Sequence, residues 1–113
     1  MALFAIAFRI LPGKTDDWRA FMAELTGARK TDFVASRARM GVHERTFLQH
    51  TPAGDFVLVT LEGDDPAGAF AKFGQGSDEF TAWFKAKVAL VHGVDLAAPP
   101  PGPLPELVVD SDA

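Results

Sequence analysis

The sequence predicts one α+β domain in which a four-stranded antiparallel sheet is built from the element order βαββαβ. Short segments in which apolar residues alternate, as in a strand, are separated by longer segments with apolar residues three or four positions apart, as in a helix. A chain of 113 residues also suits a single domain with one core. We expect residues 1–98 to form this domain and residues 99–113 to form a Pro-rich, extended C-terminal tail.

The first predicted strand covers residues 3–11. Large apolar side chains fall on one face of this segment, and mainly small apolar ones fall on the other face. A strand that is apolar on both faces is typical of the centre of a sheet, where both faces are covered. The two sets are Phe4, Ile6, Phe8 and Ile10 on one face, and Leu3, Ala5, Ala7 and Arg9 on the other.

The first predicted helix follows a Pro-Gly turn and covers residues 15–40, with an interruption. Thr15 suits the N-cap, and the two aspartates after it suit the positive end of the helix dipole. Gly27 weakens the middle of this helix, and Gly41 suits its C-terminal end. One apolar stripe runs along its first part and consists of Trp18, Phe21, Met22 and Leu25.

A hairpin is predicted after this helix. Residues 42–50 alternate but are largely polar, which favours an edge strand. The loop of residues 51–55 contains both Pro and Gly, which are typical of turns. Residues 56–62 are apolar on both faces, which favours a central strand.

The second predicted helix begins with Asp65 as N-cap and Pro66 at the first helical position. It breaks at residues 74–76, restarts with Ser77 as the cap and ends at Gly93. The restarted part carries a second apolar stripe that includes both aromatic and β-branched residues.

Residues 94–97 are predicted to supply the fourth strand, which completes the order of a ferredoxin-like fold. The first and third strands then lie at the centre of the sheet and the second at an edge. Two helices cover one face of such a sheet, so the other face exposes a large apolar patch. We therefore expect two sheets to pack into a homodimer, with the tail running along the body or the partner subunit.

Two segments resemble the dimeric α/β-barrel superfamily of ferredoxin-like proteins: FRILPGK at residues 8–14 and SDEFTAWF at residues 77–84. The similarity covers residues 3–97, and the Pro-rich tail resembles a subgroup of unassigned activity related to antibiotic-biosynthesis-type monooxygenases. The resemblance implies a dimeric barrel. Relatives include cofactor-free monooxygenases, lactone isomerases, polyketide-type cyclases and haem enzymes, but no position here matches a family motif that would identify a catalytic residue.

Composition excludes several classes of function. A net charge of −4 without a cluster of basic residues argues against a nucleic-acid partner. The sequence has no cysteine, so disulfides, thiolate metal sites and a cysteine nucleophile are excluded. No stretch approaches the roughly 20 apolar residues of a membrane span, and we expect a cytoplasmic protein without a membrane partner. No cofactor and no metal site are predicted.

The densest group of reactive side chains lies on the predicted edge strand. His43 and Arg45 are two residues apart and share a face, so they are candidate catalytic residues that bind an anionic or enolic oxygen. The alternative interpretation is an edge strand with solvated polar residues. His50 is seven residues from His43 and therefore faces the opposite side, which excludes a metal site made by these two histidines in one chain.

Aromatic residues are the candidates for a ligand pocket between helices and sheet. Their alternative interpretation is ordinary core. The residues selected are Phe8, Trp18, Phe47 and Trp83. His92 lies at the end of the second helix, where the helix dipole favours a cation, although it or His50 could also serve as an axial haem ligand.

These observations predict a homodimeric α/β-barrel protein that binds a small apolar or aromatic ligand. A cofactor-independent monooxygenase, isomerase or cyclase acting on an aromatic or polyketide-like substrate is the alternative, and a haem-binding protein is the third candidate. The sequence leaves open whether the protein is an enzyme.

Overall fold

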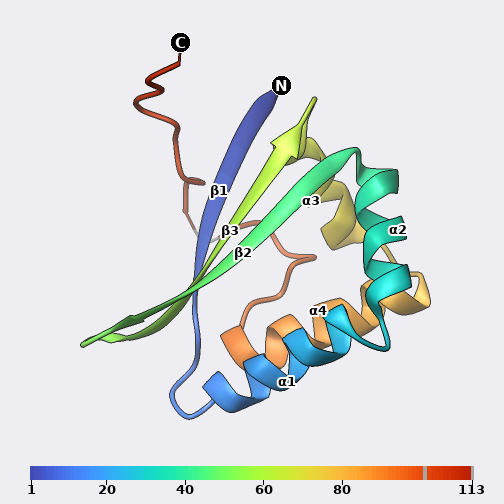
Figure 1. Ribbon diagram of the computed structural model, residues 1–113, viewed down its shortest axis with the longest axis vertical. Helices are drawn as coiled ribbons and strands as arrows, with labels where there is room; N and C mark the ends of the chain where they lie inside the picture. The colour runs from blue at the N-terminus through green and yellow to red at the C-terminus, as the bar shows by residue number, and fades with distance from the viewer. Residues whose placement is uncertain (101, 113) are drawn as a thin grey trace.

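The computed structural model describes residues 1–100 and 102–112 and has an α+β architecture, as the sequence predicts. In Figure 1 an open, strongly twisted sheet lies beside a group of helices that cover one of its faces. Within the described residues the sheet has three strands and there are four helices, so the predicted four-stranded βαββαβ order is wrong. The elements are β1 (Ala2–Arg9), α1 (Thr15–Thr26), α2 (Lys30–Met40), β2 (Val42–Thr51), β3 (Gly54–Gly63), α3 (Pro66–Gln75) and α4 (Glu79–His92).

The three strands are antiparallel in the order β1-β3-β2. The central place of β3 and the edge place of β2 are confirmed. The prediction that the first strand is central is wrong, because no described strand lies on its other side. The register aligns Phe8 and Leu48 with Val57 of the central strand, so these three side chains share the face that the helices cover.

The predicted fourth strand at residues 94–97 is instead a turn held against α3. The amide of Ala98 donates to the carbonyl of Asp95 at 3.1 Å, which closes the turn. The side chain of Gln75 donates to the carbonyl of Ala97 at 2.9 Å. The carbonyl of Leu96 lies so close to Gly74 that a Cβ atom there would collide with it. Because the carbonyl of Ala97 bonds to α3 and that of Asp95 bonds within the turn, these two groups are not available to pair with β1.

Each of the two predicted helices is divided in two. After Thr26 the chain turns at Gly27, and the amide of Arg29 donates to the carbonyl of Glu24 at 2.8 Å, which directs α2 away from α1. The predicted break after α3 is confirmed, but the cap of α4 is Asp78 rather than Ser77. The Asp78 carboxylate accepts hydrogen bonds from the amide and the hydroxyl of Thr81, and these bonds lower the pKa of Asp78.

Of the two other predicted N-caps, the one at Asp65 is present in the structure and the one at Thr15 is not. Asp65 accepts a hydrogen bond from the amide of Gly68 and begins α3, as predicted. Thr15 does not cap α1; its hydroxyl donates to the carboxylate of Asp55 at 2.6 Å and joins the helix start to the β2–β3 hairpin.

The core lies between the sheet and the helices α1 and α4. Its buried members come from β3, from both helices and from the segment that follows β1. Phe21 is at its centre, with edge-to-face contacts to Trp83 at 5.4 Å and to Phe84 at 5.2 Å between ring centroids. The buried cluster is Ile10, Trp18, Phe21, Val57, Val88 and Val91. No helix among the described residues is long and apolar enough to cross a membrane.

The opposite face of the sheet has no covering element among the described residues. Its centre is apolar, since Leu3 is 49% exposed, Leu58 36% and Phe47 53%. The register places Phe47 beside Leu58, and Leu58 beside Ala7 of β1, so these side chains form one continuous patch. We refer to Leu3, Ala5, Ala7, Phe47 and Leu58 as the outer patch.

Candidate functional site

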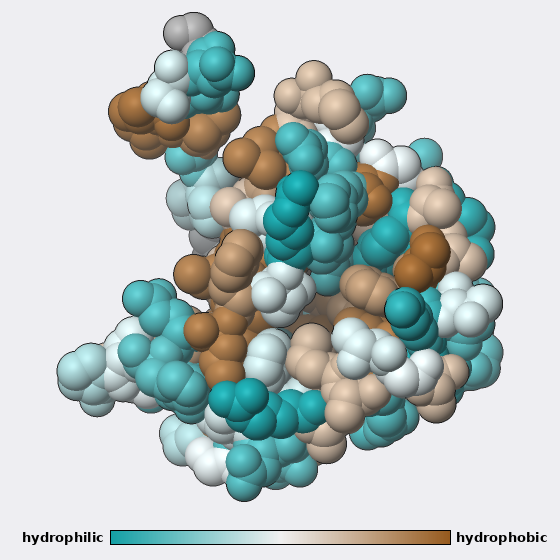
Figure 2. All heavy atoms as spheres, viewed as in Figure 1, coloured by the Kyte–Doolittle hydropathy of each residue, from teal (hydrophilic) through white to brown (hydrophobic). Residues whose placement is uncertain are grey.

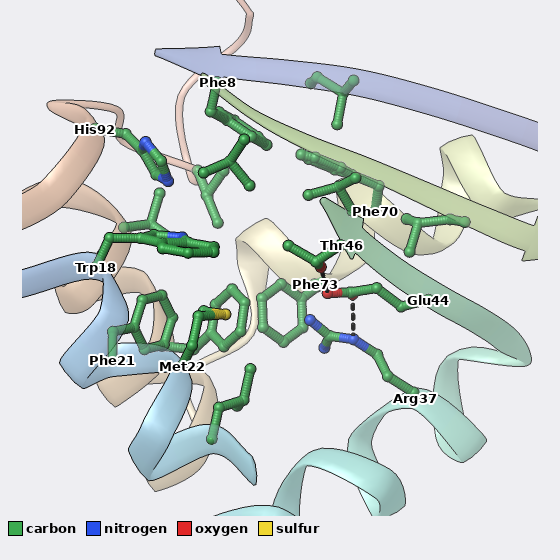
Figure 3. Close-up of a pocket in the computed structure, with 18 of the residues that line it drawn as sticks. Phe8, Trp18, Phe21, Met22, Arg37, Glu44, Thr46, Phe70, Phe73 and His92 are labelled. Carbon is green, nitrogen blue, oxygen red and sulfur yellow. Dashed lines mark hydrogen bonds and ion pairs between the residues drawn. The ribbon is translucent and has the colours of Figure 1, made fainter. Parts of the chain in front are cut away.

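A pocket of about 70 Å³ opens between the covered face of the sheet and the helices. Figure 2 shows a hollow in this part of the surface, and Figure 3 shows side chains from the strands and all four helices converging on it. The lining is almost entirely aromatic and aliphatic, and its polar side chains are Arg37, Glu44, Thr46 and His92. Its volume is well below the roughly 300 Å³ of typical small-molecule sites, so it accepts a compact group.

Two of the four predicted pocket residues line this space and two do not. Phe8 points into it from β1 and Trp18 from α1 (Figure 3). Phe47 lies in the outer patch, because its neighbour Leu48 faces the core and side chains alternate along a strand. Trp83 packs against Phe21 outside the pocket.

His43 and Arg45 share a face, as their spacing predicts, but it is the face opposite the pocket. Arg45 forms an exposed ion pair with Glu62 of the neighbouring strand, at 3.3 Å. Neither residue lines the pocket, so the structure does not bring this candidate pair to a bound ligand inside the domain.

His50 lies at the far end of the hairpin, where its Nδ1 atom is 2.8 Å from the carboxylate of Asp55. Hydrogen bonds from Thr15 and then from His50 hold the pKa of Asp55 below its usual range. This arrangement fixes the hairpin against the start of α1. Among the described residues no group of three or more histidines and carboxylates is arranged to hold a metal ion.

His92 is the polar residue at the end of the pocket between Phe8 and Trp18 (Figure 3). It is 8% exposed, and its Nδ1 atom lies 2.9 Å from the carbonyl oxygen of Arg9. A carbonyl can only accept, so Nδ1 carries the proton and the lone pair of the neutral ring is on Nε2. Burial lowers the pKa of His92, although the bond to Arg9 opposes this effect, and the ring is therefore neutral near pH 7.

The Nε2 atom of His92 is the acceptor that the pocket leaves available. Among the described residues no protein group forms a hydrogen bond with this atom. Every fully buried polar side-chain atom of these residues has a hydrogen-bond partner, so Nε2, which has none, keeps some accessible surface. The ring of Phe8 lies 5.2 Å from that of His92, with the planes tilted by 30°. A hydrogen-bond donor entering the pocket would thus meet one oriented acceptor in apolar surroundings.

A buried ion pair forms another part of the lining. The Nε atom of Arg37 donates to Glu44 at 2.7 Å, and both side chains are less than one tenth exposed. The guanidinium also donates to Ser36 at 3.1 Å and lies 4.6 Å from the centroid of the Phe73 ring. Thr46 donates to the second oxygen of Glu44 at 3.4 Å. These groups satisfy one another's charges and hydrogen bonds. The pair therefore forms part of the pocket wall and leaves few hydrogen-bonding positions for a charged ligand.

Neither His92 nor the Arg37–Glu44 pair is among the pocket residues predicted from the sequence. His92 is four residues after Val88 and therefore shares its apolar stripe, which was a signal of burial. Burial lowers the pKa of His92, which disfavours the cation predicted at this helix end. A haem group would not fit a pocket of this volume, so the haem alternative has no support here.

Comparisons with protein-family models, with curated proteins and with solved structures give no match.

Proposed function

We propose that this chain is a homodimeric protein of the dimeric α/β-barrel type that binds a compact, largely apolar molecule with one hydrogen-bond donor. The observation that carries the proposal is the neutral imidazole of His92, whose acceptor nitrogen lies in a largely apolar pocket. Buried polar groups in ligand sites fix orientation, while the apolar lining supplies most of the affinity.

The shape and chemistry of the pocket limit the ligand. Phe8 and Trp18 flank the imidazole and favour a flat ring, which can stack against them or meet them edge to face. Nε2 accepts a hydrogen bond from a hydroxyl or N–H group. An anion would have to break the Arg37–Glu44 pair to reach the guanidinium, so we favour a neutral molecule with a single ring.

Phenol is a suitable probe because it combines one ring with one donor, and toluene is its matched control without the donor. Replacing Trp83 by Phe leaves Trp18, which lines the pocket, as the single indole to report binding by fluorescence. We expect a saturable change with phenol and binding about tenfold weaker with toluene, the effect of one hydrogen bond of about 1 kcal/mol or slightly more.

The variant His92→Phe tests the acceptor, since it keeps an aromatic ring in the pocket but has no ring nitrogen to accept a hydrogen bond. Phenol and toluene should then bind about equally. In the wild type the preference for phenol should also decline once the pH falls below the pKa of His92, which burial lowers, because Nε2 then gains a proton and stops accepting. Equal affinity of the wild type for the two probes would refute the role of His92, and no saturable change with either would refute the site.

The alternative of a cofactor-independent isomerase or cyclase would use the same nitrogen. A neutral imidazole beside a bound molecule can act as a general base toward an acidic proton. His92, rather than His43 and Arg45, is the residue that this alternative would require, because it lies in the pocket.

The proposed dimer forms through the outer patch, which a monomer would expose to water. Leu58 is on the central strand, so Leu58→Lys places a charge in the middle of the proposed interface. We expect sedimentation to give twice the 12.1 kDa chain mass for the wild type and the chain mass for this variant. Gln49→Lys, at an exposed polar position of β2 on the same face, should remain dimeric. A monomeric wild type would contradict the proposal.

A further inference from the structure

The free edge of β1 is unusually open to pairing. β1 bonds to β3 on one side, and no described strand lies on the other. From Ala2 to Phe8 it contains neither a charged residue nor proline, the features that protect edge strands in soluble proteins. The opposite edge of the sheet, on β2, carries His43, Glu44 and Arg45. The two edges therefore differ, and β1 is the one suited to accept another strand.

The tail contains a segment suited to be that strand. Residues 106–109 have the sequence ELVV, and β-branched valines favour extended pairing. Leu107 is 60% exposed, Val108 78% and Val109 80%, so this apolar segment has no cover from its own domain. In Figure 1 the tail extends on the β1 side of the sheet, and Figure 2 shows apolar atoms projecting away from the body.

The prolines before this segment stiffen it and allow it to reach the sheet of a partner chain. Pro99, Pro100, Pro103 and Pro105 restrict the backbone to extended conformations and stiffen the approach. Seven residues, 99–105, can span about 20 Å when extended. This is about twice the distance of roughly 10 Å between packed sheets, so the tail can cross to a second protomer. Pro105 has no amide hydrogen, and regular pairing would begin at Glu106.

We propose that residues 106–109 of one protomer add to the β1 edge of the other as its fourth strand, in a reciprocal exchange. Backbone hydrogen bonds then satisfy the free edge, and the exposed leucine and valines gain cover. The inference rests on the proposed homodimer and adds a second contact to the outer patch.

The absence of cysteine from the sequence allows a direct test by disulfide formation. One chain carries Ala5→Cys in β1, and a second, with an affinity tag, carries a single cysteine at Leu107, Val108 or Val109. Each chain has one thiol, so a disulfide between the two must join different protomers. Facing residues of paired strands have Cβ atoms about 4.5–5.5 Å apart, close to the range that a disulfide spans. The chains are mixed by refolding together and then oxidised.

We expect a mixed disulfide, identified by its mass, for at least one tail position. Arg45→Cys is the matched control, because it lies in the same cross-strand row as Ala5 but on the β2 strand, and it should give no mixed product. Failure at all three tail positions, or an Ala5→Cys homodisulfide in their place, would overturn the exchange. A single chain that carries Ala5→Cys together with a tail cysteine gives a further test. If it forms only a disulfide within the chain, the tail pairs with β1 of its own protomer, and the exchange is refuted.

Sedimentation of the same variants under reducing conditions separates this inference from the proposed dimer. A dimeric protein without the mixed disulfide contradicts the tail exchange and leaves the outer patch as the interface. A monomeric protein contradicts both.

Discussion

Replacing Phe21 by Ala is expected to reduce the free energy of unfolding by about 3–5 kcal/mol, the usual cost of removing a buried phenyl ring. Phe21 is 2% exposed and contacts the rings of Trp83 and Phe84 of α4. Its loss leaves a cavity at the place where α1 and α4 meet, and a small domain is stable by only about 5–15 kcal/mol. Urea unfolding followed by tryptophan fluorescence measures the change.

The variant Phe21→Leu is the control, because it retains most of the volume and should cost less than about 1.5 kcal/mol. Similar losses for the two variants would show that ring contacts, rather than filled volume, determine the stability at this position. A loss below 1 kcal/mol for Phe21→Ala would contradict its place at the centre of the core.

The strands that the structure contains were predictable because their periodicity is local. Phe8 belongs to the face of large apolar residues on β1, and this face packs on the core; the polar content of residues 42–50 correctly places β2 at an edge. The fourth strand was not predictable at residues 94–97. The polar groups of Leu96 and Ala97 lie against Gly74 and Gln75 of α3, a contact between distant segments that no local pattern records.

A residue of the candidate site was predictable only where the sequence pattern shows which face of its strand or helix packs on the core. Phe8 and Trp18 reach the pocket, whereas Phe47 is turned to the outer patch by the register of the hairpin. The same alternation would have placed Glu44 inside, but a carboxylate is expected at the surface unless its partner is known. That partner, Arg37, lies on the preceding helix, and its approach depends on the turn at Gly41.

Replacing Arg37 by Met is expected to cost about 3–5 kcal/mol, because it leaves the carboxylate of Glu44 buried without its charged partner. The methionine retains much of the contact with the aromatic rings around Arg37, so the cost comes mainly from the unpaired charge. Unfolding in urea at pH 7 measures this loss.

The double variant Arg37→Met/Glu44→Gln distinguishes an unpaired charge from lost packing. Removing both charges should restore a large part of the stability, since replacing a buried ion pair by neutral groups is often close to neutral. If the double variant is as unstable as Arg37→Met, the aromatic contacts of the guanidinium, and not its charge, hold α2 against β2. Recovery would instead show that the ion pair adds little net stability to the wall of the pocket that it forms.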